Sequence, residues 1–145
     1  MSPANPEEYD RALGIALKLL KARNRFSGEI RAELSAKQVD ENSVAQVIDY
    51  LVHKGLIRDA ELAEDLAETA VKSKVWGPLR IRRELEQRLA PVECIERALS
   101  LIPSESDLLQ RALAKLGERS TPSLARRLYA DGFSRDAIES VLETR

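Results

Sequence analysis

The sequence predicts an all-α protein made of three copies of a small helical unit. Its 145 residues are rich in Leu and Ala, and aromatic residues make up only 4%, a composition that favours helix. Apolar residues recur every three or four positions, the spacing of one helix face. Several leucines and isoleucines also recur 43 positions apart, which is typical of repeat architectures.

The most distinctive stretch is Trp76-Gly77-Pro78-Leu79-Arg80-Ile81-Arg82-Arg83-Glu84-Leu85. Gly-Pro predicts the start of a helix, because the missing N–H of a first-turn proline would be unpaired there anyway. Ile81 and Leu85 fall on one side of that helix, and Arg80 and Arg83 fall on another. We therefore expect an amphipathic helix with a cationic outer face.

Composition excludes several classes of protein. The formal net charge is −1, so no overall charge drives the chain onto nucleic acid or an acidic membrane. Charged residues make up 32% of the chain, which suits an elongated molecule. Cys94 is the single cysteine, and no cluster of Cys and His has the spacing of metal ligands. The apolar runs are too short to span a membrane, and the acidic start is no signal peptide, so we expect a cytoplasmic protein.

The chain divides into a flexible lead over residues 1–6 and three-helix repeats over 7–57, 58–102 and 103–145. In the first repeat, Ser27 is the expected N-cap of the second helix, and Gly55 ends the third. In the second repeat, Asp59 is the expected cap of a helix carrying Leu62 and Leu66, with alanines beside them. Val92 is expected on the inner face of that repeat's last helix.

Helix-start and helix-stop signals are clearest in the third repeat. Ser104 and Asp107 have the spacing of a capping box. Gly117 marks a stop, and Thr121-Pro122 opens the next helix. Ser134 is the expected cap of the last one.

The repeat is supported by arithmetic on apolar positions. Pairs 43 residues apart are Leu66 and Leu109, Ile81 and Leu124, Leu85 and Leu128, Ile95 and Ile138, and Leu99 and Leu142. Between the first and second repeats, the sequence offset is 51 residues from Leu34 to Leu85 but 48 residues from Val44 to Val92. The offset drops because the first repeat has a longer connection between its second and third helices. We expect Leu66, Leu85 and Leu99 to meet in one small core, and Leu109, Leu128 and Leu142 in the next.

The basic residues of the second and third repeats are the candidate partner-binding site. They are Lys72, Lys74, Arg80, Arg82, Arg83, Arg126 and Arg127. Arginine pairs bidentately with carboxylates and phosphates, so such a cluster can dock an acidic partner or a phosphate backbone. The alternative is a solvated helix face with local pairs Arg80–Glu84 and Arg82–Glu86, each contributing about 0.2–0.5 kcal/mol. Arg83 has no acid four residues on, and Arg126 lies 43 residues after it.

Other candidate residues favour structure over chemistry. Trp76 is expected to pack at a helix junction, although an interface anchor is the alternative. Tyr50, Tyr129 and Phe133 are expected in cores or between repeats. His53 sits at a helix end, and Cys94 has no histidine nearby in sequence. No nucleophile motif, P-loop or dinucleotide fingerprint is present, so we expect no catalysis, no cofactor and no metal.

With these residues in place, the chain resembles the RecX family of recombination regulators over about residues 12 to 143. The resemblance rests on Ala12, Leu13, Leu19 and Leu20, on Gly55-Leu56-Ile57-Arg58-Asp59, on Gly77 to Leu85, and on Arg127-Leu128-Tyr129 followed by Gly132-Phe133-Ser134 and Ile138 to Leu142.

The resemblance implies a curved array of three three-helix repeats that binds the RecA recombinase filament. It further implies a monomer that bridges neighbouring filament subunits and inhibits or modulates ATPase, strand exchange and recombination. The alternative is a helix-turn-helix-like DNA-binding protein, since three-helix units with a basic helix serve that purpose. The near-zero net charge argues against it, so DNA is expected to be contacted only weakly or indirectly.

Overall fold

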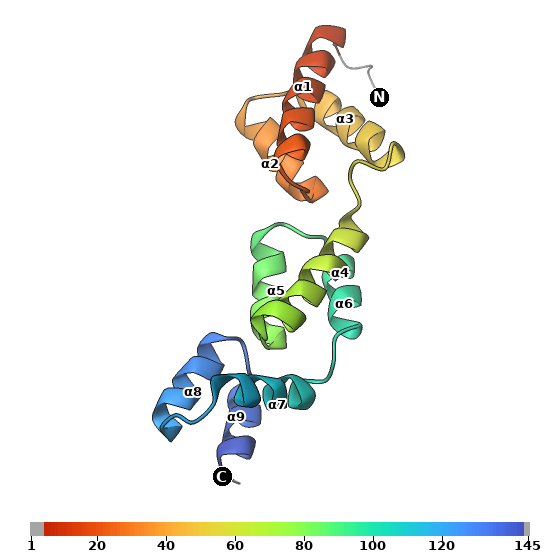
Figure 1. Ribbon diagram of the computed structural model, residues 1–145. Helices are drawn as coiled ribbons and strands as arrows, with labels where there is room; N and C mark the ends of the chain where they lie inside the picture. Colours follow the sequence, from red (N-terminus) through yellow and green to blue (C-terminus); the bar gives the residue numbers. More distant parts are fainter. Residues whose placement is uncertain (1–4, 144–145) are drawn as a thin grey trace. The chain divides into compact units, whose positions relative to one another are not determined.

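The computed structural model describes residues 5–143, and within them every regular element is a helix (Figure 1). The all-α prediction is confirmed. The elements in order are α1 (Pro6–Ala22), α2 (Ser27–Ala36), α3 (Glu41–His53), α4 (Asp59–Thr69), η1 (Ala70–Lys74), α5 (Pro78–Gln87), α6 (Val92–Ser100), α7 (Glu105–Leu116), α8 (Thr121–Ala130) and α9 (Arg135–Leu142). η1 is a π-helical turn that continues α4.

The chain forms two compact units. The first unit comprises the residues up to Leu62 together with Arg88–Pro91, and the second comprises Ala63–Gln87 and the residues from Val92 on. The boundaries of three repeats at 7–57, 58–102 and 103–145 remain a prediction. Of the predicted lead over residues 1–6, positions 1–4 lie outside the described residues. Asn5 caps α1, and Pro6 is its first residue.

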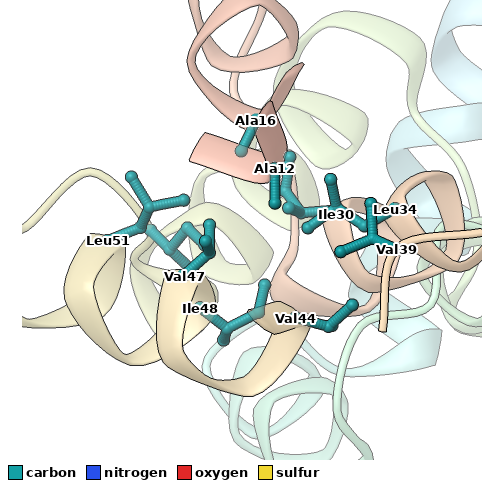
Figure 2. Close-up of a cluster of buried hydrophobic side chains, with 10 residues drawn as sticks. Ala12, Ala16, Ile30, Leu34, Val39, Val44, Val47, Ile48 and Leu51 are labelled. Atoms are coloured by element: carbon teal, nitrogen blue, oxygen red, sulfur yellow. The ribbon is translucent and has the colours of Figure 1, made fainter. Parts of the chain in front are cut away.

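The first unit has a core of small and branched side chains from α1, α2 and α3. Figure 2 shows these side chains pointing toward one another from the three helices. Ala12 and Ala16 are fully buried on α1. A methyl group at these positions lets the helix lie close to its neighbours, so the packed residues of α2 and α3 can be the larger ones. They are Ile30, Leu34, Val44, Val47, Ile48 and Leu51.

The second unit also uses alanine where leucine was expected. On α4 the buried positions are Ala63 and Ala67, whereas Leu66 is only half-buried. The predicted core leucines Leu85, Leu109 and Leu128 are buried, and Leu99 and Leu142 are half-buried. The buried stripe of α4 therefore lies one position away from the expected leucine stripe.

Three expected inner or packed residues are exposed. Val92 is 70% exposed at the start of α6, Tyr129 is 69% exposed on α8, and Tyr50 is 40% exposed on α3. The inner face of α6 is formed by Ile95 and Ala98 instead. Phe133 is fully buried, as expected. Tyrosine tolerates exposure because its hydroxyl can remain hydrated while the ring covers neighbouring apolar atoms.

Several predicted helix ends are confirmed. α5 begins at Pro78, the Ser104 hydroxyl accepts a hydrogen bond from the N–H of Asp107, and α7 ends before Gly117. The Ser134 hydroxyl likewise accepts from the N–H of Ala137 at the start of α9. The cap of α8 is Ser120, one residue before the predicted Thr121.

The predicted caps Ser27 and Asp59 act differently from the prediction. Phe26 occupies the N-cap position of α2, and Ser27 is its first helical residue. The carboxylate of Asp59 accepts hydrogen bonds from both the N–H and the hydroxyl of Ser27, at 2.8 and 2.5 Å. Asp59 therefore caps α2 from a distant part of the sequence, where a negative charge complements the partial positive charge of the helix N-terminus.

Candidate functional site: a basic surface on the second unit

All seven predicted site residues belong to the second unit. Lys72 and Lys74 lie on η1, three arginines on α5, and Arg126 and Arg127 on α8. η1 ends at Lys74 and is capped by Val75, which has a left-handed backbone with φ of 54°. A β-branched residue rarely adopts this conformation, and π-helical turns recur at functional sites. The two lysines are thus presented by an unusual and strained turn.

A close backbone contact positions α5 against the turn that follows α8. The N–H of Gly77 donates to the carbonyl of Asp131 at 2.7 Å, and the N–H of Leu79 donates to the carbonyl of Gly132 at 3.0 Å. A Cβ on Gly77 would lie 2.5 Å from the Gly132 oxygen. Gly77 is therefore required for the close approach of the two backbones.

Asp131 connects the two basic helices. Its carboxylate accepts from Arg80 of α5 at 3.0 Å and from Arg127 of α8 at 2.8 Å. The Asp131 side chain is only 9% exposed, so its charge is well compensated by the two guanidinium groups. Asp131 is not among the residues predicted from the sequence. The signal that could have identified it is its position four residues after Arg127 and directly before Gly132.

Trp76 lies beneath two cations. The Arg80 guanidinium carbon is 4.0 Å from the centre of the indole ring, and the Lys74 nitrogen is 4.4 Å from it. Both distances fit cation–π contacts. Trp76 is half-buried, which supports its expected structural role and also brings Lys74 and Arg80 together.

Two more predicted residues form ion pairs with acids of their own unit. Lys72 pairs with Glu68 one turn earlier. Arg82 of α5 pairs with Glu96 of α6 at 2.6 Å. The hydrogen bond to Glu96 raises the pKa of Arg82, and the same bond lowers the pKa of Glu96 below its ordinary value of 4.5.

The alternative interpretation of the cluster named two local pairs. Arg80 forms its ion pair with Asp131 in the turn after α8, and not with Glu84 of its own helix. Arg82 forms its ion pair with Glu96 of α6, and not with Glu86. The charge of Glu86 still adds to the raised pKa of Arg82, after the larger effect of the hydrogen bond to Glu96. The arginines connect helices, so they also contribute to holding the second unit together.

Arg83 and Arg126 differ from the ion-paired site residues, and also from Lys74, which lies over the Trp76 ring. Both are exposed, and neither takes part in an ion pair with another residue of the described range 5–143. Arg126 lines a shallow hollow of about 320 Å³ together with Tyr129 and Ile138. Such guanidinium groups can bind a carboxylate or phosphate without first breaking an internal pair.

Residues 5–143 contain no group of three or more His, Cys, Asp and Glu side chains placed to hold a metal ion. No helix in this described part is both long and apolar enough to cross a membrane.

The fold defines an all-helical protein of tandem three-helix domains. Family models of RecX match two segments: the first three-helix domain matches residues 12–51, and the second matches residues 59–99. The Regulatory protein RecX of Thermotoga petrophila is 32% identical over 133 residues, which cover 90% of this chain and 81% of that protein. The chain belongs to the RecX family.

Solved structures and further relatives agree with this family. The crystal structure of RecX from Lactobacillus salivarius has the same fold, with a TM-score of 0.76 at 21% identity over 97% of each chain. The Regulatory protein RecX of Bacillus pumilus is 28% identical over 88% of this chain. The matched region spans only 52% of the Bacillus pumilus protein and 54% of the one from Staphylococcus saprophyticus. The relatives are named as regulatory proteins, not as enzymes.

Proposed function

We propose that this chain is a regulator that binds the RecA recombinase filament and modulates its recombination, ATPase and strand-exchange activities. Membership of the RecX family supports the regulatory role. The proposed action is binding without catalysis, by a monomer in the cytoplasm. The basic surface is the proposed contact.

The observation that carries this proposal is a pair of exposed arginines, Arg83 and Arg126, which form no ion pair with any residue between positions 5 and 143. They lie at the same relative place on α5 and α8, 43 residues apart. A filament repeats its own surface along its length, so a repeated cation can meet a repeated acid. Arg80, Arg82 and Arg127 are already paired, and their proposed role is to orient the surface and add to its positive potential.

The mechanism needs no chemistry at the contact. A protein bound across neighbouring recombinase subunits opposes the subunit movements that accompany nucleotide turnover and strand exchange. Binding energy that favours one filament state shifts the population toward it. Attraction between exposed charges is screened by salt, so this binding is expected to weaken as ionic strength rises.

The test is co-sedimentation with recombinase filaments, using the double variant Arg83→Glu/Arg126→Glu. Filament affinity should fall, and the remaining binding should depend less on salt. Helicity and melting should hardly change, because both side chains are exposed. The control is Lys18→Glu/Lys21→Glu on α1, which changes the net charge equally on exposed positions of the first unit.

Three outcomes can be told apart. Loss of binding in the arginine variant alone supports the proposal. Equal loss in both variants means that net charge, and not the site, governs binding. Unchanged binding and inhibition would place the contact on an acidic or apolar surface. A parallel titration with duplex DNA alone, across salt concentrations, tests the DNA-binding alternative through the slope of affinity against salt.

A further inference from the structure

The two units contain contacts of the same construction, which we call the first joint and the second joint. In the first joint, the start of α2 at residues 27–29 meets the turn after α5 at residues 88–90. In the second joint, the start of α5 at residues 77–80 meets the turn after α8 at residues 131–133. A Cβ on Gly28 would lie 2.6 Å from the Leu89 oxygen, and a Cβ on Gly77 would lie 2.5 Å from the Gly132 oxygen.

The turns occupy equivalent places in the repeat. Gln38, Leu89 and Gly132 have positive φ values of 62°, 62° and 95°. They are spaced by 51 and then 43 residues, the same offsets that relate Leu34, Leu85 and Leu128. The backbone thus confirms the alignment that the leucines predict. By the same offsets, Glu29 is equivalent to Arg80 in the repeat alignment, and Arg88 is equivalent to Asp131.

At these equivalent positions the ion pairs have opposite polarity. In the first joint the acid is on the helix start, where Glu29 pairs with Arg88 of the turn at 3.1 Å. In the second joint the acid is on the turn, where Asp131 pairs with Arg80 of the helix start at 3.0 Å. The carboxylates are only 12% and 9% exposed.

Each acid is also held by a second arginine. Arg23 lies 3.2 Å from Glu29, and Arg127 lies 2.8 Å from Asp131. The two joints therefore share one design, a nearly buried carboxylate between two guanidinium groups, but the acid comes from opposite partners. A chance surface pair would not be expected to repeat both the backbone contact and the double arginine.

We propose that this reversed polarity determines which helix start docks on which turn, and so prevents a second copy of the chain from docking out of order. If the α2 start met the turn after α8, Glu29 would face Asp131. If the α5 start met the turn after α5 of another copy, Arg80 would face Arg88. In the first arrangement two carboxylates would share only Arg23 and Arg127, and in the second two guanidinium groups would meet with no acid between them. Specific interfaces use such like-charge contacts to reject wrong partners.

The turn after α2 is closed by a contact within the chain. Its Lys37 is equivalent to Arg88 and Asp131 by the same offsets. The Lys37 carbonyl accepts a hydrogen bond from the Arg11 guanidinium at 2.7 Å. In the second joint, the corresponding Asp131 carbonyl accepts from the N–H of Gly77. Arg11 thus occupies the acceptor that an incoming helix start would use.

The experiment exchanges the charges of the turns in the full chain. The turn-swap variant Arg88→Glu/Asp131→Arg makes both native joints like-charged and both out-of-order pairings complementary. A neutral control, Arg88→Gln/Asp131→Asn, removes the native pairs without creating new ones. A quadruple variant adds Glu29→Arg and Arg80→Glu, so that both joints regain complementary charges with exchanged polarity. Size-exclusion chromatography with light scattering over a range of concentrations, and melting followed by circular dichroism, are the measurements.

We expect the turn-swap variant to form concentration-dependent oligomers, and the neutral and quadruple variants to stay monomeric. The quadruple variant should melt about 4 °C or more above the turn-swap variant. Recovery of the parent melting temperature should be incomplete, because the new arginines at positions 29 and 131 would lie beside Arg23 and Arg127. In addition, Glu29 accepts the N–H of Phe26 and Arg80 covers Trp76 in the parent.

Two results would overturn the proposal. One is a turn-swap variant that forms no more oligomer than the neutral control. The other is a quadruple variant that melts no higher than the turn-swap variant. If the turn-swap variant does not fold at all, the quadruple variant decides: a folded monomer supports the proposal, and an unfolded chain rejects it.

Discussion

Replacing Gly77 by alanine tests the contact that positions the basic helix α5. Gly77 has no positive φ, so alanine is compatible with its backbone. On conformational entropy alone the change should stabilise the protein by about 0.4–1 kcal/mol. The new Cβ would however lie 2.5 Å from the Gly132 oxygen and 2.9 Å from a ring carbon of Phe133. Phe133 is fully buried, so neither neighbour can move away freely.

The expected result is therefore a net loss of stability. Overpacking of this kind costs about 1–3 kcal/mol, which exceeds the entropic gain. Urea unfolding followed by circular dichroism gives the free energy of unfolding for comparison with the parent. The matched control is Gly14→Ala in α1, where a Cβ would meet nothing within 4 Å. That change should stabilise the helix by about 0.5–1 kcal/mol. If Gly77→Ala stabilises the protein as Gly14→Ala does, the close approach of the two backbones is refuted.

Two further predictions concern packing and pH. Leu85→Ala should lower the free energy of unfolding in urea by about 2–5 kcal/mol, because Leu85 is buried. The control Leu79→Ala, at a 52% exposed position of the same helix, should change it by about 0.5 kcal/mol or less. Equal effects of the two substitutions would contradict the assigned helix face. The pKa of Glu96 is lowered by Arg82, so the stability from this pair is present above the unfolded-state pKa and lost as pH falls below the ordinary value of 4.5. Glu96→Gln should therefore flatten the fall in melting temperature on acidification, and an unchanged acid profile would show that the pair contributes nothing.

The sequence was sufficient for the helices and their order because those depend on local signals. Pro78, Ser104 and Gly117 act within one helical turn of their own positions, and each marks the boundary that it predicts. The 43-residue offset also holds for the backbone, since it relates Leu89 to Gly132 at equivalent left-handed turns. Local propensity and repeat spacing thus agree with the structure.

The choice between neighbouring helix faces needed tertiary information. α4 carries a leucine stripe and, one position on, the alanine stripe of Ala63 and Ala67. Hydrophobicity favours the leucines, but close packing of helices favours the smaller side chains. Pattern alone cannot weigh these two effects. Val92 was misplaced for a similar reason, because an apolar residue at the first position of α6 lies before the buried face begins.

The candidate site was predicted in its residue types but not in its pairing. The basic residues were found because they cluster in sequence, whereas Asp131 lies 51 residues from Arg80 and no pattern connects the two. The same holds for Asp59 and Ser27, separated by 32 residues. The three-dimensional position of the acids distinguishes Arg83 and Arg126 from the paired cations Lys72, Arg80, Arg82 and Arg127.

The placement of Trp76 gives this protein a built-in optical probe. It is the single tryptophan of the chain, and its ring lies against Lys74 and Arg80 beside the contact between α5 and the turn after α8. Its fluorescence therefore reports on that contact alone, while circular dichroism averages over every helix. Because a two-state protein shows coincident transitions by different probes, earlier loss of the tryptophan signal would reveal that this contact opens while the helices persist. Binding of an acidic partner to Lys74 or Arg80 would change the same emission, so docking could be followed without attaching a dye.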